Sequence, residues 1–290
     1  MTLEEAKVLA AKNVRVRPAT AGRLAGKIAI VTGAAQGFGY GIAREMLKEG
    51  ASIVVADLND ALAKRVAEEF GEHATWAKVD VSDPESVEQM VIRTVEVFGG
   101  LDILVANAGV AIAGSLDEMI PAKFEFVTKI NYNGYFLCAK YASAIMKAEH
   151  EAAPELFFDI IQINSKSGLE GSNKNGAYAG SKFGTIGLTQ SFAKELVANH
   201  IKVNSVCPGN YYDGPLWSNP EKGLFIQYLN AGKVPGAKTV DDVRKFYMDK
   251  VPMRRGCLPA DVARAIIYCV EQEYETGQAI PVTGGQVMLN

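Results

Sequence analysis

Cysteine and histidine are scarce in this chain of 290 residues, which contains four cysteines and three histidines. No two cysteines form a CxxC pair, and the histidines show no HExxH or other metal-ligand spacing. The chain has neither the cysteine density of a secreted disulfide scaffold nor a recognisable metal site. We therefore predict a reduced, cytoplasmic protein without a structural metal.

Excess positive charge and long apolar runs are also missing. The 30 lysines and arginines are balanced by 33 acidic residues, which gives a net charge of −3. Such a chain offers no strongly basic surface to a polyphosphate, so we expect no nucleic-acid partner. No apolar run approaches the roughly 18 residues that a membrane span needs, so we expect no membrane partner either.

Residues 1–25 have the character of an arm placed before the main domain, and we expect no signal peptide in them. A helix is expected over 3–11. The basic stretch 13–18 then ends in Pro18 and should run extended, because proline disfavours helix in the residue before it. Whether the arm packs on its own subunit or on a neighbouring one stays open.

Residues 26–290 alternate between short β-branched runs and segments of helical period, which indicates a single domain. The apolar runs lie at 28–32, 52–56, 103–106, 160–163, 201–206 and 279–282. The helical segments lie at 39–49, 84–98, 177–198 and 259–270. Continuously apolar strands covered by helices on both faces predict an α/β fold, a doubly wound parallel sheet of the Rossmann type.

An aromatic insertion interrupts this alternation at about 210–250. Its tyrosines, phenylalanines and tryptophan stand among glycines and prolines. A long aromatic connection beside a sheet is often a lid or a substrate wall. Alternatively, the rings form only a small satellite core, and the sequence does not decide between the two.

A glycine cluster follows the first strand, with Gly33, Gly37 and Gly39 leading into a helix. Glycines let the backbone approach a pyrophosphate, whose charge the helix N-terminus then stabilises. The next strand ends in Asp57, where a carboxylate can accept hydrogen bonds from both hydroxyls of an adenosine ribose. Asp57 would repel the 2′-phosphate of NADP and Gln36 supplies no compensating charge, so the loop predicts NAD as the cofactor.

Two further loops follow strands at the same edge of the predicted sheet. Asp80 is placed to accept a hydrogen bond from an adenine amino group, and Asn107 begins an Asn-Ala-Gly turn. Each is an ordinary turn by itself. Together they line the edge at which ligands of open α/β sheets bind.

Tyr178 and Lys182 form the most informative pair in the sequence. At positions i and i+4 they share one face of a helix. A nearby cation lowers the pKa of a tyrosine toward working pH, as a general base for an alcohol requires. Ser165, at the end of another strand, offers a hydroxyl to the same substrate oxygen. We therefore predict a proton-transfer site.

In this order, the motifs resemble those of the classical short-chain dehydrogenase/reductase family, from Lys27 to the C-terminus. The resemblance implies a seven-stranded sheet and hydride transfer between a CH–OH group and NAD. It implies that Tyr178 takes the hydroxyl proton, Ser165 (a better match than Ser167) polarises the substrate oxygen, and Lys182 holds the nicotinamide ribose. It also implies that Asn131, rather than Asn133, anchors a water of the proton relay. The cofactor-binding residues that it implies are Gly33, Gln36, Gly37, Phe38, Gly39, Asp57, Leu58, Asp80, Val81, Asn107, Ala108, Gly109, Tyr178, Lys182, Pro208 and Gly209.

The chain departs from the family pattern after Pro208-Gly209. The family often has a threonine there that touches the nicotinamide carboxamide, and residues 210–215 contain none. That contact therefore stays open.

Within the family, the segments 135–139, 162–168, 250–257 and 282–288 resemble sorbitol-6-phosphate 2-dehydrogenases and related polyol dehydrogenases. This implies a sugar alcohol, free or phosphorylated, as the substrate. A phosphate would need cations near the pocket. Asp213, by contrast, would oppose an anion and favours an uncharged polyol. The candidate substrate residues are Lys166, Lys174, Asn210, Tyr211 and Arg254, of which the three cations are candidates for holding a phosphate.

Two alternative functions remain. A 3-oxoacyl thioester reductase of the same fold would use NADPH, and Asp57 argues against it. A non-catalytic NAD-sensing protein is the other alternative, since fold does not fix function. The family resemblance also implies a homotetramer, joined through two long helices that begin near residues 117 and 177 and through the last strand.

Overall fold

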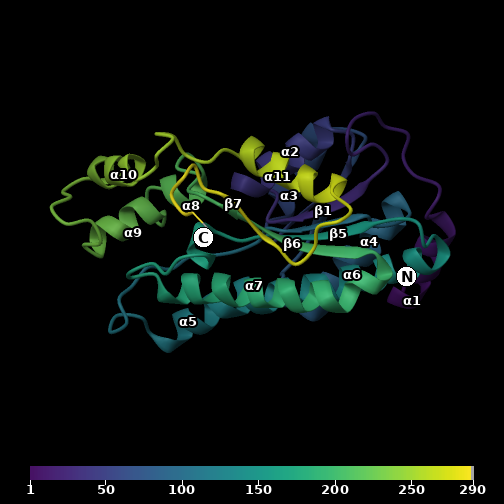
Figure 1. The fold of residues 1–290 in the computed structure, drawn as a ribbon, viewed down its shortest axis with the longest axis horizontal. Coiled ribbons are helices and arrows are strands. Elements are labelled where there is room, and N and C mark those ends of the chain that lie inside the picture. The colour runs from purple at the N-terminus through teal and green to yellow at the C-terminus, as the bar shows by residue number, and fades with distance from the viewer. Residues whose placement is uncertain (289–290) are drawn as a thin grey trace.

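A seven-stranded parallel sheet forms the centre of the computed structural model, which describes residues 1–288 (Figure 1). The strands lie in the order β3-β2-β1-β4-β5-β6-β7, and every neighbouring pair is parallel. Their carboxyl ends therefore share one edge, and the strand order reverses between β1 and β4, where ligands of open α/β sheets bind. The strands are β1 (Ile28–Thr32), β2 (Ser52–Asp57), β3 (Ala74–Lys78), β4 (Ile103–Ala106), β5 (Phe158–Ile163), β6 (Ile201–Pro208) and β7 (Ala279–Val282).

Helices cover both faces of the sheet, because its central strands β1, β4, β5 and β6 are buried along their whole length. One face packs against α2 (Gly37–Lys48), α3 (Asp60–Phe70) and α11 (Pro259–Glu271). The other packs against α4 (Pro84–Phe98), α6 (Gly134–Ala152) and α7 (Gly176–Leu196). The predicted doubly wound α/β fold of the Rossmann type is confirmed.

The chain between β4 and α6 contains a rare helical form. α5 (Pro121–Thr128) continues into a π-helical turn, η1 (Lys129–Asn133), which leads directly into α6. Such turns are often found at functional sites. The turn carries the buried side chain of Asn131. The long helix expected near residue 117 therefore begins at Pro121 and changes its winding on the way.

The N-terminal arm packs on its own chain. α1 (Leu3–Asn13) contacts α6 and α4, at the end of the sheet opposite the helices of the 210–250 insertion (Figure 1). Arg17 follows it, and its guanidinium lies 2.6 Å from the carboxylate of Glu149 and 3.4 Å from that of Asp102. Both carboxylates are buried. The sequence left two positions open for the arm, on its own subunit or on a neighbouring one. In the structure, the arm packs on its own chain.

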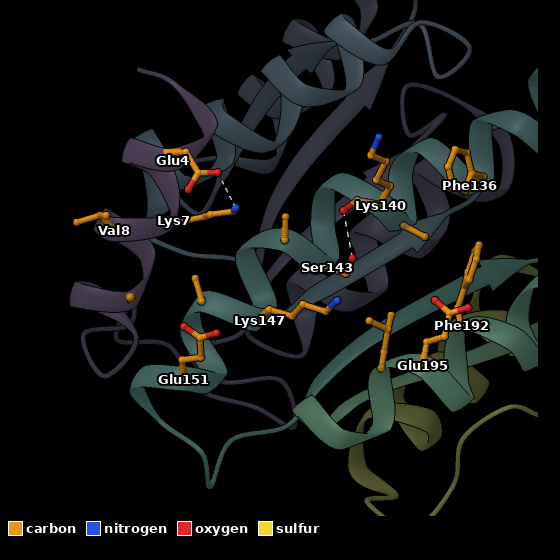
Figure 2. A pocket seen from close by; sticks show the side chains of 15 residues that line it. Glu4, Lys7, Val8, Phe136, Lys140, Ser143, Lys147, Glu151, Phe192 and Glu195 are labelled. Carbon is orange, nitrogen blue, oxygen red and sulfur yellow. Dashed lines mark hydrogen bonds and ion pairs between the residues drawn. The ribbon is translucent and has the colours of Figure 1, made fainter.

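A groove runs between α1 and the outer surface of α6 and α7. Figure 2 shows charged and aromatic side chains along it, among them Lys140 and Lys147 of α6 and Phe192 of α7. Its lining includes none of the predicted catalytic, cofactor or substrate residues. The groove is therefore a feature of the arm and is separate from the carboxyl edge of the sheet.

The insertion at 210–250 folds into α8 (Pro215–Ser218), α9 (Leu224–Asn230) and α10 (Val240–Asp249) around an aromatic core. We call this segment the lid. The Trp217 ring lies 5.0 to 5.6 Å from the rings of Tyr212, Phe225, Tyr228 and Tyr247. The side chains of this core also pack against Tyr178 of α7. The insertion thus has the aromatic satellite core that one interpretation expected, and this core lies against Tyr178.

Within residues 1–288, no helix has the length and apolar character needed to cross a membrane. All four cysteines are free and buried. The same part of the chain contains no group of three or more histidine, cysteine, aspartate or glutamate side chains arranged to hold a metal ion.

Arg17→Met should destabilise the protein. The variant would leave the buried carboxylates of Glu149 and Asp102 without their guanidinium, and removing one partner of a buried ion pair costs about 3–5 kcal/mol. Urea unfolding measures this loss. Arg15→Met is the matched control, because its ion pair with Glu155 is exposed and should contribute at most about 1 kcal/mol. Equal losses in the two variants would contradict the role given to Arg17.

Candidate active site

Close backbone packing explains the glycines after β1. Gly33 and Gly37 have φ values of 65° and 62°, in the left-handed region that favours glycine. At Gly39 the reason is space, since a Cβ there would lie 2.1 Å from the carbonyl oxygen of Gly33. The start of α2 therefore lies directly on the loop, and neither element carries a side chain that would hold a ligand away from the backbone.

The N-terminus of α2 has the polarity that a pyrophosphate requires. Gln36 is the N-cap, and its exposed side chain makes no capping hydrogen bond. A helix N-terminus without a side-chain cap suits an anion. The Phe38 ring is directed toward the lid, 5.0 Å from the ring of Tyr211. The first residues of the lid thus lie across the crevice from the glycine loop.

Asp57 lies at the end of β2, beside this loop. Its Oδ2 accepts the backbone N–H of Ala35 and its Oδ1 that of Asn59, both at 3.0 Å. An ionised carboxylate has about four acceptor positions, so positions remain for ribose hydroxyls. Leu58 is exposed, and its side chain is accessible to a ligand at this edge.

Asp80 and Val81 follow β3 and differ in character. Asp80 Oδ1 accepts the backbone N–H of Ser82 at 2.9 Å and its hydroxyl at 2.8 Å, and these bonds lower the pKa of Asp80. The ionised carboxylate suits a donor such as an amino group. Val81 is buried, and a Cβ on Gly134 would lie 2.9 Å from it, so Val81 shapes the wall of the crevice.

Asn107 joins the two strands on either side of the switch point. Its side-chain amide donates to the carbonyl oxygens of Thr32, at 2.8 Å, and Gly33, at 3.3 Å. The Thr32 hydroxyl in turn accepts the backbone N–H groups of Asn107 and Ala108, both at 3.0 Å. These bonds fix the carboxyl end of β4 against the glycine loop.

Tyr178 and Lys182 lie one turn apart on α7. Lys182 is 4% exposed, and its ammonium donates to the carbonyl oxygen of Ile163, the last residue of β5, at 2.8 Å. The same ammonium lies 5.7 Å from the centroid of the Tyr178 ring. α7 thus brings both side chains to the carboxyl edge of the sheet.

The pKa values of this pair differ from the sequence expectation. Burial raises the pKa of Tyr178, and the neighbouring Ser165 side chain only partly opposes the rise. Burial lowers the pKa of Lys182 to about 8, against the effect of Cys207. The prediction that the lysine leaves Tyr178 with a lowered pKa is wrong for the protein alone, because desolvation of the phenolate dominates.

Ser165, rather than Ser167, is directed to the tyrosine. Its side chain lies near enough to Tyr178 to lower the pKa of that phenol, and it accepts the backbone N–H of Ser167 at 3.1 Å. A short 3₁₀ helix, η2 (Lys166–Gly168), follows. A Cβ on Gly168 would lie 2.1 Å from Asn164 Oδ1, so a glycine is required in the turn that presents Ser165.

Asn131 connects the π-helical turn to the loop after β4. Its amide N–H groups donate to the Val110 carbonyl at 2.9 Å and to the Ser181 hydroxyl at 3.0 Å, while Oδ1 accepts the Val110 N–H at 2.8 Å. A Cβ on Gly109 would lie 3.2 Å from this Oδ1. Asn133 is exposed. Asn131 is therefore the asparagine at the site, and its amide N–H groups already have protein partners.

The turn after β6 is tied to β7 and to the lid. Gly209 donates its backbone N–H to the Val282 carbonyl at 2.8 Å, which fixes the Pro208-Gly209 turn. The Asn210 side chain donates to the Tyr212 hydroxyl at 3.1 Å, in the lid core. Asn210 thus contacts the core of the lid.

The three cations proposed for a phosphate have different surroundings. Lys174 donates to the Ala231 carbonyl at 2.6 Å and so anchors the lid. Arg254 is exposed and lies 3.5 Å from the Asp249 carboxylate. Lys166 is half-buried and directly follows the serine that contacts the tyrosine. Lys174 and Arg254 therefore contact residues of the lid. Of the three candidate phosphate-binding cations, Lys166 is the one that lies beside Ser165 and Tyr178.

Cys207 is a neighbour that the sequence reasoning missed. It is buried in β6, and burial raises its pKa to about 11, against the effects of the Ser205 side chain and the charge of Lys182. No sequence signal indicated it, since a cysteine within an apolar strand is typical of a core position.

The family model for short chain dehydrogenases matches residues 27–219. The chain belongs to this family. Sorbitol-6-phosphate 2-dehydrogenase from Escherichia coli (strain K12) is 36% identical over 270 residues, which cover 91% of this chain and 99% of that protein. The resemblance predicted from the motifs is confirmed.

Two solved structures are similar to this fold. Sorbitol-6-phosphate 2-dehydrogenase from Erwinia amylovora matches with a TM-score of 0.82 and 36% identity, over 90% of this chain and 100% of that one. A 3-ketoacyl-(acyl-carrier-protein) reductase from Brucella melitensis, solved in complex with NADH, matches with a TM-score of 0.77 and 28% identity, over 91% and 99%. The family is one of oxidoreductases that act on CH–OH groups, and the glycine loop described above fits a nicotinamide dinucleotide.

Gly39→Ala should abolish most of the dinucleotide affinity. The new Cβ would meet the Gly33 carbonyl at 2.1 Å, so the loop and the start of α2 must separate. We expect the dissociation constant of NADH, measured by fluorescence titration, to rise by at least about tenfold, a loss of about 1.4 kcal/mol. Gly187→Ala is the control, because the space around this helical glycine is open and NADH binding should stay unchanged. Wild-type affinity in Gly39→Ala would refute the proposed cradle.

Proposed function

We propose that this protein is an NAD-dependent oxidoreductase that interconverts a sugar alcohol, sorbitol 6-phosphate or a related polyol, and the corresponding ketose. The observation that carries the proposal is the placement of Tyr178 and Ser165 beside the buried ammonium of Lys182, which lies 5.7 Å from the centroid of the Tyr178 ring. Oxidation of an alcohol needs a base for its proton and an acceptor for its hydride. The carboxyl edge of this sheet has residues suited to hold both.

Each catalytic residue has a separate role in this proposal. Tyr178 takes the hydroxyl proton during oxidation and returns it during reduction. Ser165 orients the substrate oxygen toward the phenol. Lys182, with a pKa of about 8, is mostly protonated at neutral pH, so its charge favours the phenolate as the proton leaves. Asn131 positions the loop after β4 through its bonds to Val110.

The nicotinamide cofactor supplies the hydride acceptor when it is bound. The protein's part is to hold it: the glycine loop and the N-terminus of α2 receive the pyrophosphate, and Asp57 receives the adenosine ribose. We propose NAD rather than NADP, because the Asp57 carboxylate would repel a 2′-phosphate. The exposed Gln36 offers no charge to compensate.

A polyol substrate is supported by the relatives. Two of them, from Escherichia coli and Erwinia amylovora, are named sorbitol-6-phosphate 2-dehydrogenases and match almost the whole chain. The second candidate is a 3-oxoacyl thioester reductase, favoured by the match to the Brucella melitensis enzyme. The acidic residue at the end of β2 argues against an NADPH enzyme. A non-catalytic NAD sensor would have little need for the Ser165–Tyr178 pair.

We also propose that the protein is a cytoplasmic homotetramer. The helices expected to join its subunits expose large aromatic side chains. Phe124 and Phe126 on α5, Phe136 on α6 and Phe183 on α7 are 43% to 48% exposed. Contact with a second copy would cover this apolar surface.

A substrate panel tests the proposed reaction. Hexitols, pentitols and their 6-phosphates are incubated with NAD or NADP, and the absorbance of the reduced cofactor is followed. We expect turnover of a polyol or its phosphate, faster with NAD than with NADP because of Asp57. Turnover of a thioester or a steroid without turnover of any polyol would reject the substrate class.

Tyr178→Phe should stop turnover without preventing cofactor binding. Removing a general acid–base group costs about 10²–10⁴-fold in rate, whereas the dinucleotide contacts stay in place. The measurements are steady-state rates and NADH titration. Tyr268→Phe, which alters an exposed tyrosine of α11, is the control and should keep full activity. If Tyr178→Phe kept wild-type turnover, the phenol would not be the base.

A further inference from the structure

Three lysines from separate parts of the chain gather between the catalytic edge and the lid. Lys166 lies in η2, next to Ser165. Lys233 follows α9, and Lys250 follows α10 at its C-cap. The sequence indicated only Lys166, because the positions of the other two depend on how the lid folds.

Two of these ammonium groups lie over neighbouring rings of the lid core. The Lys233 ammonium is 4.0 Å from the centroid of the Tyr228 ring, and the Lys250 ammonium is 5.8 Å from that of Tyr247. The two rings are stacked, with centroids 5.5 Å apart. Lys233 also donates to the Ser172 hydroxyl, at 3.2 Å, in the loop that follows η2. The lid core thus carries its two cations toward the segment that contains Lys166.

The three lysines repel one another. Burial, and after it the charges of Lys166 and Lys250, lower the pKa of Lys233 to about 8. Burial also lowers the pKa of Lys166, and Lys250 adds to this effect. Within residues 1–288, the one carboxylate among the charges that act on these two lysines is that of Glu170, which acts on Lys166. Cations held together with so little compensation favour an anionic ligand.

The cluster adjoins the catalytic tyrosine through one ring. Tyr228, over which Lys233 lies, has its pKa raised by burial and further by the nearby phenols of Tyr247 and Tyr178. Tyr178 also packs against the lid core to which Tyr228 belongs. Tyr228 is buried between Lys233 and Tyr178, so the lysine cluster adjoins the place where a substrate hydroxyl would meet Tyr178.

We propose that Lys166, Lys233 and Lys250 form a subsite for the phosphate group of a phosphorylated polyol, at the end of the substrate remote from the reacting carbon. The inference rests on the proposed function and specifies its substrate as a phosphomonoester. A phosphate monoester carries close to two negative charges near neutral pH and presents three acceptor oxygens, which three ammonium donors can satisfy.

Asp213 does not oppose this anion in the way that the sequence suggested. Its carboxylate lies 2.6 Å from the guanidinium of Arg244, on α10. Both side chains are largely exposed. The charge of Asp213 is therefore paired, and the argument that it favoured an uncharged polyol loses its basis.

The test compares sorbitol 6-phosphate with sorbitol as substrates of the wild-type enzyme and of Lys233→Gln, Lys250→Gln and Lys166→Gln. Hydrogen bonds to charged groups contribute about 1.5–3 kcal/mol, so each variant should lose about 10- to 150-fold in kcat/KM for the phosphate ester. The loss should lie mainly in KM, because the phosphate is remote from the reacting carbon. With sorbitol, which has no phosphate, each variant should lose several-fold less kcat/KM than it loses with the phosphate ester. Lys245→Gln, an exposed lysine of α10, is the control and should lose nothing with either substrate.

Three results would overturn the assignment. Equal losses with both substrates would mean that the lysines only support the lid. Unchanged kcat/KM for sorbitol 6-phosphate in all three variants would mean that the phosphate binds elsewhere. A wild-type enzyme that oxidises sorbitol no less efficiently than its 6-phosphate would leave the proposed function standing and remove the subsite.

Failure of the proposed function itself gives a different result. If the wild-type enzyme oxidises neither polyol, inorganic phosphate is titrated calorimetrically into the NADH-saturated protein, whose pyrophosphate cradle is already filled. Binding that Lys233→Gln weakens and Lys245→Gln does not would support the lysine cluster as an anion site. Absence of phosphate binding to the wild type would refute it.

The affinity for the phosphate ester should also depend on pH. The cations around Lys233 are Lys166 and Lys250, its other neighbours are the Ser172 hydroxyl and the Tyr228 ring, and Glu170 acts on Lys166. Because the pKa of Lys233 is about 8, its charge is present below pH 8 and is lost as the pH rises above it. The phosphate ester is already doubly charged there. The KM for sorbitol 6-phosphate should therefore rise between pH 7 and 9 in the wild type, and a rise of the same size in Lys233→Gln would contradict the assignment.

Discussion

A buried ammonium group, that of Lys182, is the constraint on which the catalytic edge depends. The side chain is 4% exposed and donates to a backbone oxygen at the end of β5. Burying a charge is costly unless it has partners, so Lys182 holds α7 and β5 in one fixed relation. Tyr178 lies one turn earlier on α7 and therefore reaches the sheet edge at a fixed position. Burial also raises the pKa of Tyr178, so its phenol is protonated at neutral pH in the protein alone.

The sheet edge and the lid have different tasks in this fold. The edge, from the glycine loop to Lys182, is made of strand ends and helix starts whose positions the parallel sheet dictates. The lid is an insertion with its own aromatic core around Trp217. Relatives that match this chain over its length act, by their names, on a sugar-alcohol phosphate or on an acyl thioester. A shared edge with different substrates means that specificity must come from residues outside the edge.

The features that the sequence predicted correctly are those that a short stretch of chain determines by itself. The apolar runs of β1 and β4, the glycines before α2, and the spacing of Tyr178 and Lys182 each express their structural role locally. The rest depends on contacts between distant segments. Arg17 meets Glu149 across 132 positions, and no local pattern marks that pair. The direction of the Tyr178 pKa was missed for the same reason, because the side chains that bury the ring belong to the lid.

In the proposed phosphate subsite, structural and recognition roles share the same lysine side chains. An ammonium over an aromatic face is attracted by the ring, and the attraction grows when water is excluded. The Tyr228 ring therefore holds Lys233 in place, and the rings of Phe246, at 4.1 Å, and Tyr247, at 5.8 Å, hold Lys250. Preorganised charges lose less entropy on binding than flexible surface lysines do. The aromatic core of the lid thus also fixes the positions of its lysines. In the proposed subsite, a bound anion would reduce the repulsion between these lysines.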